Sequence, residues 1–107
     1  MEIIDYALGL KLAGNNPELA EELLGMLTAT LANDIKHFRK LYAAQDFAQL
    51  GAAAHRLHGA TAYCGTSRLK AAIALLETAA KQNNINDLPE LLDNVEQESV
   101  LVLKEVK

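Results

Sequence analysis

Apolar residues recur every three or four positions along most of the chain, which is the period of an α-helix. Alternation of β-branched residues, the pattern of a strand, is absent, and good helix formers (Ala, Leu, Glu, Gln and Lys) dominate. The longest stripe follows Asn16 and Pro17, a favourable cap and first residue for a helix. It comprises Leu19, Leu23, Leu27, Leu31, Ile35, Phe38 and Tyr42.

The stripes and their boundary residues predict five helices, the first of them short. Asp46 with Gln49 three residues later favours a capped helix start, and Gly65 is a natural stop. Asp87 with Glu90 predicts a second capped start. Four long helices with short links indicate an all-α fold, an antiparallel up-and-down four-helix bundle with a short extra N-terminal helix, in a single domain over residues 1–107. The predicted helices cover residues 4–13, 17–43, 46–64, 66–82 and 87–106.

The charge of the chain is unevenly distributed. The formal net charge is −4, which argues against nucleic-acid binding. Residues 1–35 carry −5, residues 36–81 carry +5 and residues 82–107 carry −4. Because salt screens charges beyond roughly 8 Å, a partner close to the middle of the chain meets its basic part. This favours an acidic or phosphorylated partner there, although a set of solvated lysines and arginines is an equal alternative.

Composition excludes several other classes. The longest unbroken apolar run, Ala71 to Leu76, is far shorter than the ~20 residues of a membrane span, so we expect no direct membrane contact. The acidic start, Glu2 and Asp5, is unlike a targeting peptide. Cys64 is the only cysteine, so no internal disulfide can form.

The predicted helix over residues 46–64 carries the clearest chemical signal. At 100° per residue, one face collects apolar residues and the opposite face is centred on His55. The side chains predicted to flank His55 on the exposed face are unusually small for a solvated surface. The core face contains Leu50, Ala53, Leu57, Ala60, Thr61 and Cys64, and the exposed strip contains Ala48, Gly51, Ala52, Gly59 and Ala62.

Each interior glycine of this helix costs about 1 kcal/mol relative to alanine. On the wheel, Gly51 and Gly59 point away from the core, so packing does not explain them. They fit a surface on which a partner's backbone must come close to the imidazole of His55. The alternative is an alanine-rich helix with incidental glycines, or one covered by the N-terminal segment.

An exposed imidazole titrates near neutrality, and its neutral form is a nucleophile that can accept a phosphoryl group. Cations would stabilise the transferred group, and the candidates are Arg56, His58, Arg68 and Lys70. A carboxylate could fix the ring tautomer, and Glu77 is a candidate. Glu77 could equally form an exposed (i, i+4) pair with Lys81.

The stretch from Ala54 to Gly59, followed by Gly65, Leu69 and the pair Leu76-Glu77, resembles the signature of histidine phosphotransfer (HPt) domains. That signature reads His-x-Leu-Lys-Gly, then Gly six residues later, Leu after four more and Leu-Glu after a further seven. Every spacing fits. His58 stands where most of the family has lysine, as in C-terminal HPt domains of tripartite hybrid sensor kinases.

The resemblance implies that His55 is the phosphoacceptor, with catalytic neighbours His58, Glu77, Arg56 and Lys70. It implies phosphorylation on Nε2, with the residue at position 77 near Nδ1. The partners would be upstream and downstream response-regulator receiver domains, which bring Mg²⁺, while this chain binds no cofactor. We expect a monomeric, cytoplasmic phosphocarrier without an ATP site of its own, standing alone or as the cytoplasmic C-terminal part of a membrane sensor kinase.

Two other interpretations remain open. His55 and His58, with Cys64 and Glu77, could bind a metal or haem, although Cys64 projects to the other side of the helix. The chain could also be an interaction adaptor that uses the small-residue strip without chemistry. We expect His37 to be solvated, and Phe47, Tyr63 and Cys64 to be packing residues; they complete the set of candidate side chains.

Overall fold

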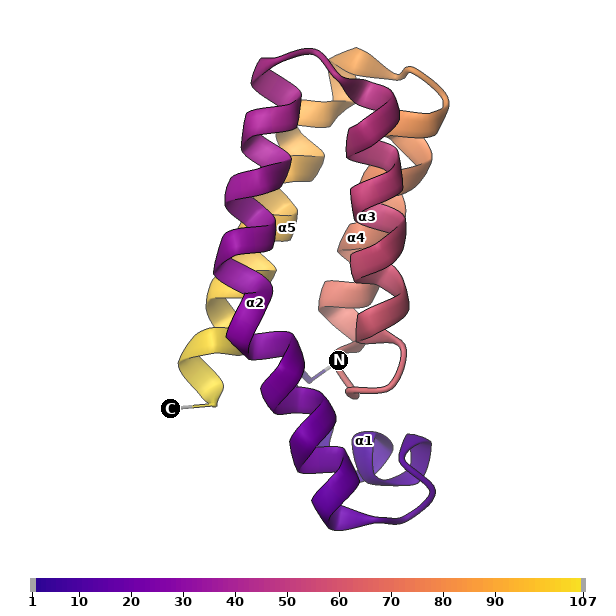
Figure 1. Cartoon of the computed structure of the whole chain (residues 1–107), viewed down its shortest axis with the longest axis vertical. Coiled ribbons are helices and arrows are strands. Elements are labelled where there is room, and N and C mark those ends of the chain that lie inside the picture. The colour runs from indigo at the N-terminus through magenta and orange to yellow at the C-terminus, as the bar shows by residue number, and fades with distance from the viewer. Residues whose placement is uncertain (1, 107) are drawn as a thin grey trace.

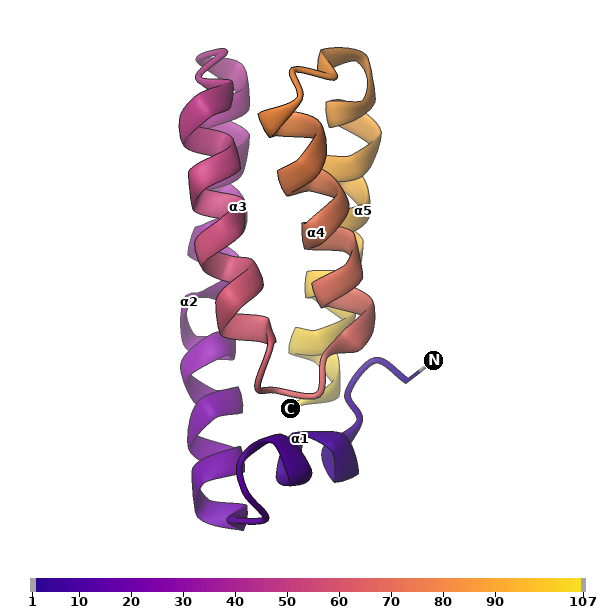
Figure 2. The ribbon, with the colours of Figure 1, turned by 90° about the vertical axis from the view of Figure 1, so that its right-hand side faces the viewer.

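A computed structural model describes residues 2–106 and contains five α-helices and one 3-10 helix. Four helices run alternately up and down side by side, and the short first helix lies across one end of them (Figures 1 and 2). The predicted all-α four-helix bundle with an extra N-terminal helix is therefore confirmed. The elements are α1 (Tyr6–Leu12), α2 (Pro17–Ala43), α3 (Phe47–Thr61), α4 (Ser67–Lys81), η1 (Ile85–Asp87) and α5 (Leu88–Glu105).

Two of the predicted caps fix helix starts as expected. The side chain of Asn16 accepts a hydrogen bond from the backbone N–H of Leu19 at 3.2 Å, and α2 begins at Pro17, directly after Asn16. Asp46 accepts from the N–H of Gln49 at 3.2 Å and starts α3. These local interactions set the starts of two neighbouring helices, α2 and α3.

The predicted cap at Asp87 is wrong. Asp87 has helical dihedral angles, φ −87° and ψ −18°, because it closes the short helix η1 that leads directly into α5. A capping residue needs an extended backbone for its side chain to turn back onto the next N–H groups. The side chain of Asp87 makes no capping hydrogen bond, and η1 replaces it as the entry to α5.

The N-terminal segment is held against the turn between α3 and α4. The N–H of Asp5 donates to the carbonyl of Gly65 at 2.8 Å, and Gly65 has φ +69°, a conformation that favours glycine. A Cβ atom on Gly65 would collide with the carbonyl oxygen of Asp5. Helix α3 ends at Thr61, earlier than predicted, because the chain turns from Ala62 onward, where the N–H of Ala62 bonds to the carbonyl of Gly59.

The core lies between α2, α3, α4 and α5. The predicted stripe of α2 is buried in its middle, from Leu27 to Phe38, and Leu31 and Phe38 are fully covered. Leu19 stays 39% exposed because the first turns of α2 extend beyond the ends of α3 and α4 (Figure 1). The most buried large side chains are Leu31, Phe38, Leu50, Leu69, Ile73, Leu76, Leu88, Leu92, Val95 and Val102.

Candidate functional site

His55 lies in the middle of α3 and is open to solvent. Its side chain is 66% exposed, although α3 itself is packed against α4. The ring nitrogen Nδ1 is 2.9 Å from Oε2 of Glu77 on α4, and the Glu77 side chain is only 15% exposed. The largely covered carboxylate of Glu77 therefore contacts one nitrogen of an exposed ring.

This contact defines the state of the imidazole. An ionised carboxylate only accepts hydrogen bonds, so the proton of a neutral His55 ring lies on Nδ1. The other nitrogen, Nε2, then carries the lone pair, and it has no partner among the described residues. The site thus presents a nucleophilic nitrogen, Nε2, on a ring whose tautomer is fixed by Glu77.

Glu77 also makes the ion pair that the sequence offered as an alternative. Lys81 Nζ is 2.7 Å from Oε2 of Glu77, one helical turn further along α4. Both interpretations of Glu77 occur at once, because Lys81 and His55 share the same oxygen. The hydrogen bond from Lys81, followed by that from His55, lowers the pKa of Glu77 below its ordinary value, against the opposing effect of burial. Lys81 is the member of this cluster that the site prediction missed; its (i, i+4) spacing from Glu77 was the signal.

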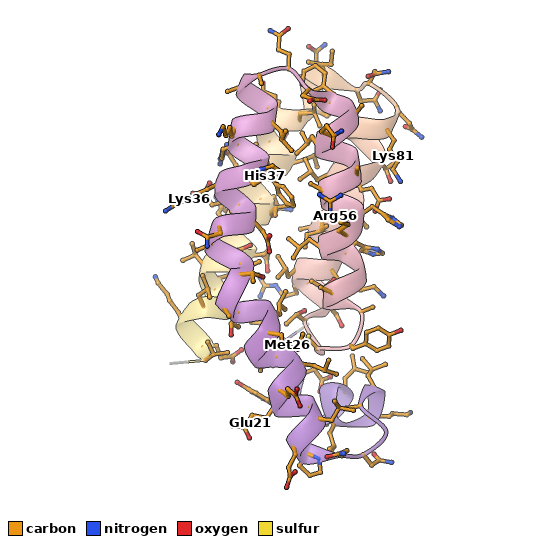
Figure 3. All side chains as sticks on the ribbon, in the orientation of Figure 1. Glu21, Met26, Lys36, His37, Arg56 and Lys81 are labelled. Carbon is orange, nitrogen blue, oxygen red and sulfur yellow. The ribbon has the colours of Figure 1, made fainter. Side chains whose placement is uncertain are left out.

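The predicted cations differ in how the structure places them. Arg56 is exposed and lies over a groove between α2 and α3 that His37 also lines (Figure 3). His58 is half-buried on α3, less than one turn from His55. Lys70 lies seven residues before Glu77, roughly 10 Å along α4, outside the His55–Glu77 cluster.

Arg68 is not available as a site cation. Its guanidinium Nη2 is 2.9 Å from Oε2 of Glu98 on α5, and the Glu98 side chain is only 12% exposed. The arginine therefore ties α4 to α5 within the bundle. Of the four candidate cations, Arg68 is thus paired with Glu98 and does not join the His55–Glu77 cluster.

The strip of small residues around His55 is only partly exposed. Ala48 and Gly59 are exposed, and Ala52 and Ala62 are half-buried. Nothing lies within 4 Å of the position that a Cβ on Gly59 would occupy, so this glycine leaves open space beside the ring.

Gly51 contradicts the prediction, since it is buried. A Cβ on Gly51 would lie 3.2 Å from Cγ of Lys81 and 3.6 Å from Cβ of Ala80. Helix α3 is rotated so that Gly51 faces α4 and Ala54 is fully buried, while Ala60, predicted for the core, is exposed. The helical wheel of α3 alone could not show where α4 packs, and this packing sets the rotation.

The remaining candidates lie apart from the cluster. Cys64 is buried, as expected, and burial raises the pKa of its thiol. Phe47 packs beside Tyr42, with ring centroids 6.2 Å apart. Tyr63 is 56% exposed, which contradicts its prediction as a packing residue, because α3 has already ended there. Within residues 2–106, no group of three metal-ligating side chains comes together, and no helix is long and apolar enough to cross a membrane.

Comparison with known proteins identifies the class that this fold and site define. The family model described as "Hpt domain" matches residues 22–105, and the chain belongs to this family. The HPT domain from a sensor hybrid histidine kinase of Shewanella has a similar structure, with a TM-score of 0.79 and 28% identity over 97% of this chain and 92% of that chain. The predicted resemblance is confirmed.

Two curated relatives are more specific. The chain is 39% identical over 103 residues to the sensor protein GacS of Pseudomonas syringae pv. syringae, covering 91% of this chain and 11% of that protein. It is 40% identical over 84 residues to the sensor histidine kinase GacS of Pseudomonas protegens, covering 78% of this chain and 9% of that protein. The chain thus spans about a tenth of these relatives. Its function is histidine phosphotransfer in a phosphorelay, and HPt domains act as phosphocarriers that interact with receiver domains.

Proposed function

We propose that His55 is the phosphoacceptor of this domain and that Nε2 is the atom that carries the phosphoryl group. The observation that supports this most directly is the 2.9 Å contact between Nδ1 and Glu77 beneath a ring that is 66% exposed. It occupies Nδ1 and leaves Nε2 free. His37 is also exposed, but no carboxylate of the described residues contacts it.

The transfer step follows from this arrangement. The Nε2 lone pair attacks the phosphorus of an aspartyl phosphate in line, and the bond from phosphorus to the aspartyl oxygen breaks. The aspartyl carboxylate leaves with the electron pair, and the phosphorylated ring, protonated at Nδ1, is cationic. Glu77 accepts the Nδ1–H and balances that charge. The reverse attack by a second aspartate regenerates neutral His55.

Two side chains flank the phosphoryl group in this proposal. Arg56, which is exposed on α3, and His58, which is half-buried, would face the phosphoryl oxygens as their charge develops. His58 stands at the position where most of the family carries lysine. Lys70 would contribute only a longer-range positive potential from α4.

The partner in this proposal is a response-regulator receiver domain, used both upstream and downstream. Its acidic pocket would bring the Mg²⁺ that coordinates the phosphoryl oxygens, so this chain contributes no cofactor. Gly59 and Ala48 are exposed, and with Ala52 and Ala62 they would let the pocket approach the ring. The chain would act as a cytoplasmic, monomeric phosphocarrier without its own ATP site. Because the relatives are named sensor proteins and sensor kinases, it would stand alone or form part of a longer sensor kinase.

The proposal is tested by mixing the chain with a receiver domain that carries a radiolabelled aspartyl phosphate. We expect an acid-labile, base-stable phosphate on residue 55, and no labelling of the His55→Gln variant. His37→Gln is the matched control, because it removes an exposed histidine on α2. His58→Ala should slow the transfer without abolishing it. Equal labelling of the His55→Gln chain and the parent chain would refute the assignment.

A further inference from the structure

Lys81 is the cation that contacts the carboxylate beneath His55. Its Nζ is 2.7 Å from Oε2 of Glu77, and the same oxygen is 2.9 Å from Nδ1 of His55. The two nitrogens therefore lie within about 6 Å of each other, given ordinary hydrogen-bond lengths. Glu77 cannot turn toward one donor without loosening its contact with the other.

Gly51 gives the side chain of Lys81 the room to reach that oxygen. The aliphatic stem of Lys81 crosses α3 at Gly51, where a Cβ atom would lie only 3.2 Å from Cγ of the lysine. Most Cβ contacts are longer than this, so a methyl group would push the stem away. A glycine inside a helix is otherwise unfavourable, and this contact gives a physical reason for one at position 51.

We propose that Lys81 is a positioning residue for phosphoryl transfer: through Glu77 it holds the His55 ring in place and offsets the negative charge that faces the ring, and Gly51 provides the space that it needs. This inference rests on the proposed role of His55. Lys81 does not touch the reacting nitrogen. It acts on the carboxylate, which contacts the other ring nitrogen.

The charged groups around the ring define what removal of Lys81 should do. Besides Glu77 and Lys81 on α4, α3 contributes Arg56 and His58, and α2 places Asp34 and His37 along the groove on the far side of Arg56. Only Glu77 is within hydrogen-bond distance of His55 among the described residues. Without Lys81, the full charge of Glu77 would favour the imidazolium form of His55.

The expected size follows from Coulomb's law. A unit charge removed at about 6 Å in a water-like dielectric changes a titration midpoint by about half a pH unit. In the Lys81→Met variant at low ionic strength, the pH at which half of the His55 rings are protonated should therefore rise by about that amount. In the Glu77→Gln variant it should fall, because the carboxylate that favours the cation is gone.

The measurement is a proton NMR titration of the three histidine rings in the unphosphorylated full chain. Lys36→Met is the matched control, because it removes the same charge from an exposed lysine of α2 on the side away from Lys81 (Figure 3). We expect this control to leave the His55 midpoint unchanged. The pH profile of phosphorylation by a labelled receiver should move with the midpoint in Lys81→Met.

Gly51→Ala tests the second part of the proposal. It should shift the His55 midpoint in the same direction as Lys81→Met, by a smaller amount. Gly25→Ala is the matched control, because Gly25 lies inside α2 and a Cβ there would meet nothing within 4 Å. Gly25→Ala should raise the Tm by about 4–8 °C and leave His55 unchanged, whereas Gly51→Ala should gain less.

The proposal is overturned if Lys81→Met leaves the His55 midpoint and the pH profile where they are in the parent. A shift in Glu77→Gln alone would then show that the lysine is only a surface partner of the carboxylate. A Gly51→Ala chain with an unmoved midpoint and the full stability gain of Gly25→Ala would overturn the role of Gly51. The titration requires no phosphate, so its failure is distinct from unlabelled His55 in the transfer assay.

Discussion

Gly59 offers a prediction in which stability and activity change in opposite directions. A Cβ at this position meets nothing within 4 Å, so an added side chain extends into solvent beside His55. Replacing an interior helix glycine removes a backbone-entropy penalty of about 1 kcal/mol relative to alanine. For a chain of this size that corresponds to a rise in Tm of about 4–8 °C, and glutamate should retain roughly half of the gain.

The same side chain would stand where a receiver must approach the ring. Gly59→Glu should therefore give a more stable chain that accepts phosphate at least ten times more slowly, measured by thermal denaturation and by single-turnover transfer from a labelled receiver. Gly59→Gln separates size from charge, since it adds nearly the same volume without a carboxylate one helical turn from His55. Gly25→Glu controls for stability, because its site on α2 is equally open. Transfer at the parent rate by a stabilised Gly59→Glu chain would refute the docking argument.

Three further predictions concern the support of the site. Gly65→Ala should lower the free energy of unfolding by about 2–3 kcal/mol, since it strains a left-handed turn and breaks the contact with Asp5, and it should expose the α1 amides to hydrogen exchange. Arg68→Ala should cost about 1–3 kcal/mol in chemical denaturation, because it leaves the largely buried carboxylate of Glu98 unpaired; a loss near zero would contradict this. The pKa of Glu77 is lowered in the folded chain, so its stabilising effect is present above its ordinary value of about 4.5 and is lost as the pH falls through the folded pKa. The stability difference between the parent and Glu77→Gln should accordingly shrink below about pH 4, and a constant difference from pH 7 to pH 3 would contradict the shift.

The sequence predicted the helices well because their signals are local. The cap at Asn16 and the apolar period after it set α2 to within a residue, and Asp46 does the same for the start of α3. The predicted cap at Asp87 was wrong because the chain enters α5 through a 3-10 helix. The capping pattern in the sequence cannot distinguish such an entry from an extended one. The turn after α3 includes Gly65, which bonds to Asp5, and a contact between residues sixty positions apart leaves no local signal.

The site was predictable as far as single-helix geometry reaches. His55 and Gly59 lie exposed on one face, as the wheel indicates. Gly51 is not exposed, because the rotation of α3 is set by its contact with α4. The sequence of α3 alone does not indicate that contact. The sequence identified Glu77 as a candidate but could not show whether it contacts His55 or Lys81. The structure places both donors on one oxygen of Glu77.

The position of His55 on the solvent side of one continuous helix has a kinetic consequence for the proposed relay. One face of one ring must serve the donor receiver and the acceptor receiver in turn, so the two compete for the same place and never form a ternary complex with the chain. Turnover should follow ping-pong kinetics, with parallel lines in double-reciprocal plots. An excess of either unphosphorylated receiver should slow the relay by occupying the histidine.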